Sequence, residues 1–343
     1  MQQTDVLIIG AGPIGLEVAW HLRKAGIEVL QVDAGPIGAT ISTLFPEHTR
    51  FFSSPERLAI AGVDLPTTHQ EKVTGSEYLA YLRSVAVTRD LPVLTWHRVI
   101  DARPLTRGWS VSLESKSGAR QEVEANRLVL ATGGTHHPRR LGIPGEDLPH
   151  VRSHLGDPHQ YFRRRVLIVG GKNSAAESAL RCWRVHADVH LSYRGPALHE
   201  RIKYWIRPEL QSLIDEGRIT GWMPSKVQCI TPDTVDIQMA DSGEVQTIPF
   251  DDVILQIGYE QDDSIFRLFG VTTSGDQNAP VFHPETLETN IPGIYVVGTA
   301  IAGTQKRYKA YIETSHDHGP RVMAAITGAP PPAPMNARVL PES

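Results

Sequence analysis

Cysteine is almost absent from this chain, which has only two in 343 residues, Cys182 and Cys229. The two lie far apart in the sequence, and no Cys-x-x-Cys motif occurs. This spacing fits neither a disulfide framework nor a metal site. We therefore predict no metal-binding residues and interpret the two cysteines as unrelated structural thiols.

Long apolar runs and an excess of positive charge are also missing. No stretch approaches the roughly 20 apolar residues that span a bilayer, and the first apolar stretch, at residues 6–9, is too short for a signal peptide. A formal net charge of −4 argues against a nucleic-acid partner. We expect a cytoplasmic protein that acts on small molecules and binds neither a membrane nor a nucleic acid.

The N-terminus carries the pattern of a dinucleotide-binding turn. An apolar run is followed by Gly10, Gly12 and Gly15, and then by apolar residues at helical spacing. The first glycine permits a tight turn, the second lets the backbone approach a pyrophosphate, and the third lets the helix pack on the strand. A second strand ends in Asp33, the acid expected to bind a ribose. The cofactor contacts expected here are Gly10, Gly12, Pro13, Ile14, Gly15, Asp33 and Ala34.

A second unit of the same kind begins near residue 165. An apolar strand is followed by Gly170, Gly171 and a helix, but Lys172 occupies the place of the second glycine. The next strand ends in Arg194 rather than in an acid, and an arginine there accommodates the 2′-phosphate of NADPH. A solvated loop cation is the alternative interpretation of Arg194. The cofactor contacts expected here are Gly170, Gly171, Lys172, Asn173, Ser174, Ala175, Tyr193, Arg194, Arg201 and Lys203.

Strands that end in glycine also close each unit, at residues 127–133 and 253–258, and a third follows at 290–300. A helix is expected from about residue 309. We predict an α/β fold of two Rossmann-like, three-layer ββα domains, with the NADPH-binding domain inserted in a discontinuous FAD-binding domain. The predicted parts are 1–149 and 263–328 for the FAD-binding domain, 150–262 for the NADPH-binding domain, and 329–343 for a proline-rich tail.

With these elements placed, the chain resembles the thioredoxin-reductase-like two-domain flavoproteins, and among them the bacillithiol-disulfide reductase family. The resemblance is carried by FFSS at 51–54, GGKNSA at 170–175, IKYWI at 202–206, ETLETN at 285–290 and LPES at 340–343. It implies FAD and NADPH as cofactors, a low-molecular-weight thiol disulfide such as bacillithiol disulfide as the acceptor, and a homodimer or homotetramer. It also implies flavin contacts at Phe51, Phe52, Val99, Ala131, Thr132, Gly133, Gly298, Thr299 and Ile312. Two adjacent aromatic residues in a core would explain Phe51 and Phe52 equally well.

The chain departs from this family pattern in three places. Thioredoxin reductases carry Cys-x-x-Cys before the second unit, where this chain has Ser153 and Gly156. Bacillithiol-disulfide reductases commonly have a cysteine inside the first turn, where this chain has Ile14. The superfamily usually ends its late strand in Gly-Asp, and Thr299 takes the place of that aspartate. A dithiol relay is therefore excluded, and the acceptor stays open between a disulfide, a quinone, dioxygen and another electron carrier.

Such an acceptor needs a proton donor close to the flavin. We expect the catalytic residues to be His48, which precedes the FFSS segment, and Glu313 and His316 in the late segment, where His318 is a further candidate. The alternatives to a disulfide reductase are a flavin monooxygenase, a ferredoxin- or quinone-type NADPH reductase, and a redox sensor without turnover. The Phe-x-Gly-x-x-x-His hallmark of monooxygenases is missing from the sequence.

Overall fold

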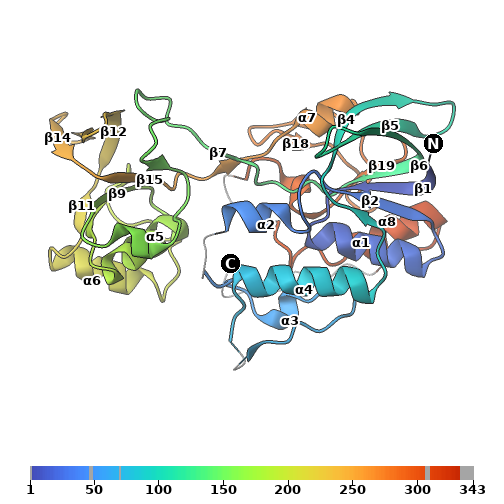
Figure 1. Cartoon of the computed structure of the whole chain (residues 1–343), viewed down its shortest axis with the longest axis horizontal. Helices are drawn as coiled ribbons and strands as arrows, with labels where there is room; N and C mark the ends of the chain where they lie inside the picture. The colour runs from blue at the N-terminus through green and yellow to red at the C-terminus, as the bar shows by residue number, and fades with distance from the viewer. Residues whose placement is uncertain (1, 46–48, 69–70, 306–309, 333–343) are drawn as a thin grey trace. The chain divides into compact units, whose positions relative to one another are not determined.

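The computed structural model describes residues 2–45, 49–68, 71–305 and 310–332. The chain forms two compact units, one made of residues 1–137 and 260–343 and the other of residues 138–259 (Figure 1). The second unit is inserted in the first, and both are α/β, so the predicted fold class is confirmed. His48 and the LPES ending lie outside the described residues.

The first unit is built on a seven-stranded sheet. Its strands before the insertion are β1 (Gln2–Ile9), β2 (Val29–Val32), β3 (Val93–Leu94), β4 (His97–Pro104), β5 (Trp109–Ser115) and β6 (Arg120–Leu130). Its helices there are α1 (Pro13–Lys24), α2 (Ala39–Leu44), α3 (Pro55–Leu58) and α4 (Gly75–Thr88). After the insertion come α7 (Ser264–Leu268), β17 (Thr273–Ser274), β18 (Ala279–Pro280), β19 (Ile294–Val296), η3 (Gly298–Ala302) and α8 (His318–Thr327). Strands β7 (His137–Pro138) and β16 (Tyr259–Glu260) pair where the chain leaves and re-enters this unit.

The strand order of this sheet is β3-β2-β1-β6-β5-β4, with β19 pairing parallel to the end of β6. Strands β3, β2, β1, β6 and β19 are parallel, whereas β4, β5 and β6 form an antiparallel meander. Alternate β1 residues serve opposite faces: Val6 and Ile8 pack with α1, α4 and α8, and Leu7 and Ile9 pack with the meander and α7. This gives the three predicted layers.

The second unit has a five-stranded parallel sheet and a three-stranded antiparallel one. Its elements are β8 (Val151–Arg152), η2 (Pro158–Tyr161), β9 (Arg165–Val169), α5 (Asn173–Arg184), β10 (Asp188–Ser192), α6 (Arg207–Asp215), β11 (Thr220–Trp222), β12 (Ser225–Ile230), β13 (Thr234–Met239), β14 (Val245–Pro249) and β15 (Asp252–Leu255). The parallel sheet has the order β11-β10-β9-β15-β8. Helix α5 packs on β9 and β10, and the β12-β13-β14 sheet covers the core on the other face.

Three boundaries differ from the expectations, and the first is the return to the first unit, which falls at residue 260 rather than 263. The break between the units lies at residues 137 and 138 rather than 149 and 150, because Leu141, Ile143 and Leu148 pack into the core of the second unit. The late helix was expected from about residue 309 but begins at His318. Pro320 has no N–H to donate, so it can be accommodated only in the first turn of a helix and places the start close to residue 318.

Candidate functional site

The first glycine-rich turn leaves an open surface in front of α1. A Cβ built on Gly10, whose φ is +112°, would lie 2.4 Å from the Ala131 carbonyl oxygen, and one on Gly15 would lie 2.3 Å from the Gly10 carbonyl oxygen. Both positions therefore require glycine. Around Gly12 no heavy atom of the described residues, apart from Gly12 and its chain neighbours, lies within 4 Å of a built Cβ, and none of their side chains caps the helix. The free N–H groups of α1, which begins at Pro13, thus face open space that suits a phosphate.

Asp33 closes one side of this surface at the end of β2. Its Oδ2 accepts the Ala11 N–H at 2.7 Å and its Oδ1 accepts the Gly35 N–H at 2.8 Å. Burial raises the pKa of Asp33 above its ordinary value, although both backbone donors oppose that shift. Each carboxylate oxygen keeps lone pairs for a ribose hydroxyl. Ala34, which follows, is exposed.

The opposite side is made by the ends of β6 and β19. The Thr299 hydroxyl accepts the Gly134 N–H at 3.0 Å, and the Gly133 carbonyl accepts the Gln261 amide at 3.0 Å. Thr132 Oγ1 is buried and has no hydrogen-bond partner among the residues that the structure describes. A buried hydroxyl without a partner is costly, so this side fits a ligand that carries polar groups.

His318 holds the turn that contains Gly298. The Gly298 N–H donates to His318 Nδ1 at 2.8 Å, and burial lowers the pKa of this histidine to about 3. His318 is therefore neutral and acts as a buried acceptor, unlike the proton donor considered from the sequence. A Cβ on Gly298 would lie 3.2 Å from the Ile14 Cβ, so the Ile14 side chain packs directly against this turn. Ile14, which stands where the family resemblance leads us to expect a cysteine, is buried.

Three of the expected flavin contacts lie in hydrophobic cores. The Phe51 ring stacks on Phe45 at 4.6 Å and meets the Tyr78 ring edge-on at 4.9 Å. Val99, on β4, is buried in the core on one face of the sheet, and Ile312 packs against the same core cluster as Phe51. These contacts support the core interpretation of Phe51. Phe52 is half-buried.

The expected catalytic residues of the late segment are held by other groups. His316 Nδ1 lies 3.3 Å from Glu17 Oε2, and its Nε2 lies 2.8 Å from the Arg57 carbonyl oxygen. Burial alone would lower the pKa of His316, but these two acceptors raise it above its ordinary value. When His316 is protonated, both ring nitrogens can donate, and the ring then pairs with the Glu17 carboxylate. Glu313 Oε1 accepts the Ser53 hydroxyl at 2.5 Å.

The second glycine-rich turn is covered by an aromatic ring. A Cβ on Gly170 would lie 2.4 Å from the Gln256 carbonyl oxygen, so the turn requires glycine there. Cβ atoms on Gly171 and Gly195 would lie 2.1 and 2.4 Å from the Tyr193 ring, which therefore sits between the two glycines. Tyr193 directly follows β10, and its side chain lies against the glycine-rich turn. Ala175 is buried beneath Gly170, and Ser174 is exposed beside it.

Cations surround the start of α5. The pKa of Lys172 is lowered by burial and by the charges of Arg201, Arg139 and Arg194. Burial and three of these cations also lower the pKa of His199. The guanidinium groups of Arg139, Arg194 and Arg201 form no ion pair or hydrogen bond with any residue in the described part of the chain. Glu200 is an acid whose charge opposes this shift at His199. A cluster in which cations predominate suits an anion.

A side-chain amide fixes this cluster to the helix. Asn173 Oδ1 accepts the Lys203 N–H at 2.8 Å, which ties the loop after β10 to the first turn of α5. Of the cations expected from the sequence, Lys172, Arg194 and Arg201 lie close enough for their charges to interact, whereas the Lys203 ammonium lies over the Trp205 ring. Arg139 and His199 were missed, since neither belongs to a motif and only folding places them at this turn.

Neither cysteine is suited to redox chemistry. Cys182 is fully buried in α5, and burial raises the pKa of its thiol to about 12. Cys229 lies on β12, and its Sγ lies 3.9 Å from the Ile230 carbonyl oxygen. Both therefore behave as structural residues, and neither lies at a glycine-rich turn.

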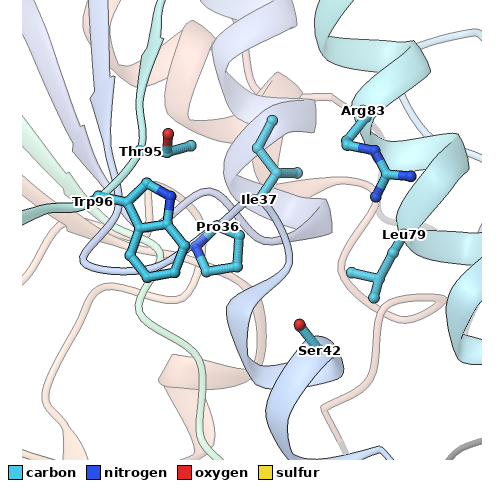
Figure 2. A pocket seen from close by; sticks show the side chains of 7 residues that line it. All are labelled: Pro36, Ile37, Ser42, Leu79, Arg83, Thr95 and Trp96. Carbon is cyan, nitrogen blue, oxygen red and sulfur yellow. The ribbon is translucent and has the colours of Figure 1, made fainter.

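A hollow of about 240 Å³ lies in the first unit, between α2, α4 and the segment that joins β3 to β4 (Figure 2). Its lining residues are Pro36, Ile37, Ser42, Leu79, Arg83, Thr95 and Trp96. None of them belongs to the expected site. Trp96 has a φ of +60°, which is unusual for a bulky residue and could not be anticipated from the sequence. In the described part of the chain, no helix is long and apolar enough to cross a membrane.

Comparison with known proteins identifies the family. Residues 7–298 match the family described as pyridine nucleotide-disulphide oxidoreductase. The chain belongs to this family. It is 32% identical to bacilliredoxin reductase Bdr of Bacillus subtilis over 95% of this chain and 98% of that protein. It matches the bacillithiol disulfide reductase of Bacillus cereus with a TM-score of 0.90 and 32% identity over 95% of this chain and 99% of that one. A ferredoxin–NADP reductase of Ignicoccus hospitalis is 24% identical over 86% of this chain and 89% of that protein.

The predicted kinship with bacillithiol-disulfide reductases is confirmed by these matches. The chain is a flavoprotein oxidoreductase of the type that uses FAD and NADPH. Its residues fit these groups: the glycine cradle and Thr132 suit FAD in the first unit, and the cations around Lys172 suit NADPH in the second.

Proposed function

We propose that the chain uses NADPH to reduce a low-molecular-weight thiol disulfide, with bacillithiol disulfide as the first candidate and without a cysteine of its own in the electron path. The observation that carries this proposal is the cluster of unpaired arginines where the chain follows β10, which suits the 2′-phosphate of NADPH. The substrate class follows from the names of the relatives, bacilliredoxin reductase and bacillithiol disulfide reductase.

Bound FAD supplies the two-electron chemistry between NADPH and the acceptor. The overall reaction consumes one NADPH, one proton and one disulfide, and releases NADP⁺ and two thiols. In the first unit, the open N–H groups of α1 would hold the pyrophosphate and Asp33 the ribose. Thr299 and His318 fix the turn that packs on Ile14.

In the second unit, Arg194 and Arg201 would hold the 2′-phosphate, and Lys172 stands in front of α5 where a pyrophosphate binds. An acid at the end of β10 would repel this phosphate, whereas an arginine attracts it. These residues bind and orient the nucleotide. The proposed catalytic roles of His48, Glu313 and His316 stay predictions, and the bonds of His316 to Glu17 and Arg57 favour a structural role for it.

The buried Ile14 supports a second candidate function, namely electron transfer to an acceptor other than a disulfide. Isoleucine cannot attack a sulfur atom, so a disulfide would have to receive its electrons directly from the flavin. A ferredoxin- or quinone-type acceptor needs no such nucleophile. A flavin monooxygenase is the third possibility considered from the sequence.

Anaerobic stopped-flow mixing distinguishes these functions. The protein is first reduced with NADPH and then mixed with bacillithiol disulfide, glutathione disulfide, a quinone or dioxygen. Fast reoxidation by a disulfide supports the proposal, and the Cys182→Ala/Cys229→Ala variant should behave the same. Reoxidation by the quinone alone would favour the second candidate, and a persistent flavin hydroperoxide spectrum in air would favour the monooxygenase.

The expected homodimer or homotetramer and the cytoplasmic location also stay predictions. Light scattering of the purified protein tests the first, and fractionation of the source cells tests the second.

A further inference from the structure

Two neighbouring arginines at the start of the second unit have opposite environments. Arg140 forms ion pairs with Asp147 at 2.5 Å and with Glu146 at 3.6 Å. Arg139 forms no ion pair or side-chain hydrogen bond with any residue that the structure describes, and it is half-buried. A partly desolvated guanidinium without a counter-charge is unfavourable unless an anion binds to it.

The position of Arg139 is well defined. Its backbone N–H donates to the Gly258 carbonyl oxygen at 2.9 Å. Its side chain runs along Gly258, with Cδ and Nε at 3.8 and 3.9 Å from a Cβ built there. Gly258 follows β15, and the nearby Gln256 carbonyl lies directly against Gly170. Arg139 therefore lies beside the second glycine-rich turn, at the carboxyl end of β15.

Gln256 adds a second, independent observation at the same place. Its side chain is only 9% exposed, and its Nε2 has no hydrogen-bond partner in the described part of the chain. Most buried polar atoms are hydrogen-bonded, so an unpaired amide at the end of β15 indicates that a polar ligand belongs there. Arg139 also lies close enough to Lys172 for its charge to act on the lysine.

The topology assigns each half of a dinucleotide to one side of β9. The sheet order places β10 on one side of β9 and β15 on the other, and a dinucleotide crosses the sheet edge at such a point. The adenosine half lies over β10, because Arg194 follows that strand. The nicotinamide half must then lie over β15, where Arg139 and Gln256 are found.

We propose that Arg139, together with Lys172, forms a pyrophosphate site, in which Arg139 binds the phosphate that carries the nicotinamide riboside. This inference deepens the proposed function and rests on its nicotinamide dinucleotide. It separates two tasks: Arg194 recognises the 2′-phosphate that distinguishes NADPH from NADH, whereas Arg139 binds a phosphate that both dinucleotides share. Arg139 is thus an affinity residue that does not discriminate between them.

Calorimetric titration of the FAD-loaded protein with NADP⁺, NAD⁺ and 2′,5′-ADP tests the assignment. The last ligand has the adenosine half and its 2′-phosphate but lacks the nicotinamide-side phosphate. Arg139→Gln should weaken the binding of NADP⁺ and of NAD⁺ by the same factor, about 10- to 100-fold. The dissociation constant of 2′,5′-ADP should change by no more than about twofold. Arg194→Gln should instead weaken NADP⁺ and 2′,5′-ADP and leave NAD⁺ unchanged.

Arg140→Gln is the matched control, because it removes the charge of the neighbouring arginine, which is already paired with acids. This variant should bind all three ligands with the affinity of the wild-type protein. Arg139→Lys keeps the charge without the forked donors and should recover part of the lost affinity. Equal losses for NADP⁺ and 2′,5′-ADP in Arg139→Gln, or no loss at all, would overturn the assignment. If the wild-type protein binds NAD⁺ but not NADP⁺ or 2′,5′-ADP, the NADPH proposal fails, while the effect of Arg139→Gln on NAD⁺ still decides the role of Arg139.

Discussion

The two glycine-rich turns share one backbone design and differ in charge. In the first, Gly12 leaves the start of α1 open and Asp33 ends the next strand. In the second, Lys172 stands before α5 and Arg194 follows the next strand. A carboxylate there accepts bonds from ribose hydroxyls, whereas a guanidinium attracts a phosphate. The fold supplies the helix and the turn in both units, and we expect a few charged residues to decide which nucleotide binds.

The two units also differ in the titratable side chain whose burial makes the stability of the unit depend on pH. The first buries His318 as a neutral acceptor. The second half-buries Glu177 on α5, and this partial burial raises the pKa of the carboxyl to about 7 despite the opposing charge of Arg181. The stabilities of the two units should therefore respond to pH in opposite directions.

The largest effect is expected when the first turn is given the cation of the second. Gly12→Lys should abolish FAD retention, with a loss of affinity above about 100-fold, because the side chain would fill the space in front of α1. The apoprotein should stay folded, since φ at Gly12 is −78° and nothing lies near its Cβ. Flavin absorbance of the purified protein measures this. The reciprocal Lys172→Gly should keep FAD, and a yellow Gly12→Lys protein would contradict the assignment of this turn.

Removal of the cation after β10 should weaken the binding of NADPH but not that of NADH. Arg194→Ala is expected to raise the KM for NADPH by about 10- to 100-fold and to leave that for NADH nearly unchanged, because only the 2′-phosphate contact is lost. Steady-state kinetics with both cofactors measure the ratio. Arg184→Ala, which removes an arginine paired with Glu209 at 2.7 Å, is the control. Equal effects on NADPH and NADH would disprove a role of Arg194 in specificity.

Acid should destabilise the first unit through His318. The pKa of His318 in the folded protein is about 3, below the ordinary value of 6.5. The loss of unfolding free energy from keeping this histidine neutral is therefore absent above pH 6.5 and grows as the pH falls towards 3. At pH 5 the loss is about 2 kcal/mol of unfolding free energy relative to neutral pH. Denaturant titrations at both pH values measure it. His318→Asn, which keeps an acceptor for the Gly298 N–H, should flatten this dependence; an unchanged slope would show that His318 is not its source.

High pH should lower the unfolding free energy of the second unit by less than acid lowers that of the first unit, and it should do so through Glu177. Its folded pKa of about 7 lies above the ordinary value of 4.5, so the penalty is absent below pH 4.5 and is complete above pH 7. Because the side chain is partly exposed, the cost at pH 8 is on the order of 2 kcal/mol or less. Glu177→Gln should therefore raise stability at pH 8 and not at pH 4. Glu209→Gln, at an ion-paired position on α6, should give no such gain, and an equal gain from both variants would rule out burial as the cause.

Regular elements and their glycines were predictable, because local patterns create them. The strands before Gly10 and Gly170 and the acid or arginine after the following strand all lie where periodicity placed them. The start of α8 was misplaced, since the turn before it is held by side-chain bonds such as that from the Ser315 hydroxyl to the Tyr311 carbonyl, at 2.7 Å. Such bonds compete with helix formation and have no periodic signature.

Long-range packing escaped prediction. Nothing in the sequence around Phe51 shows that Phe45 and Tyr78 will surround its ring. The same holds for His316, whose partners Glu17 and Arg57 are distant in sequence. The type of residue was visible in each case, but its partners depend on segments that meet only after folding.

By itself, the sequence determined the family, the two nucleotide units, their cofactors and the absence of a Cys-x-x-Cys motif, because each of these follows from residues that are neighbours along the chain or from simple counting. Only the tertiary structure decided which cations lie close together, which histidine is a neutral acceptor, and which of two adjacent arginines lacks an ion-paired acid among the described residues. Charge pairing and burial depend on distances between remote segments, and these distances exist only in the folded protein.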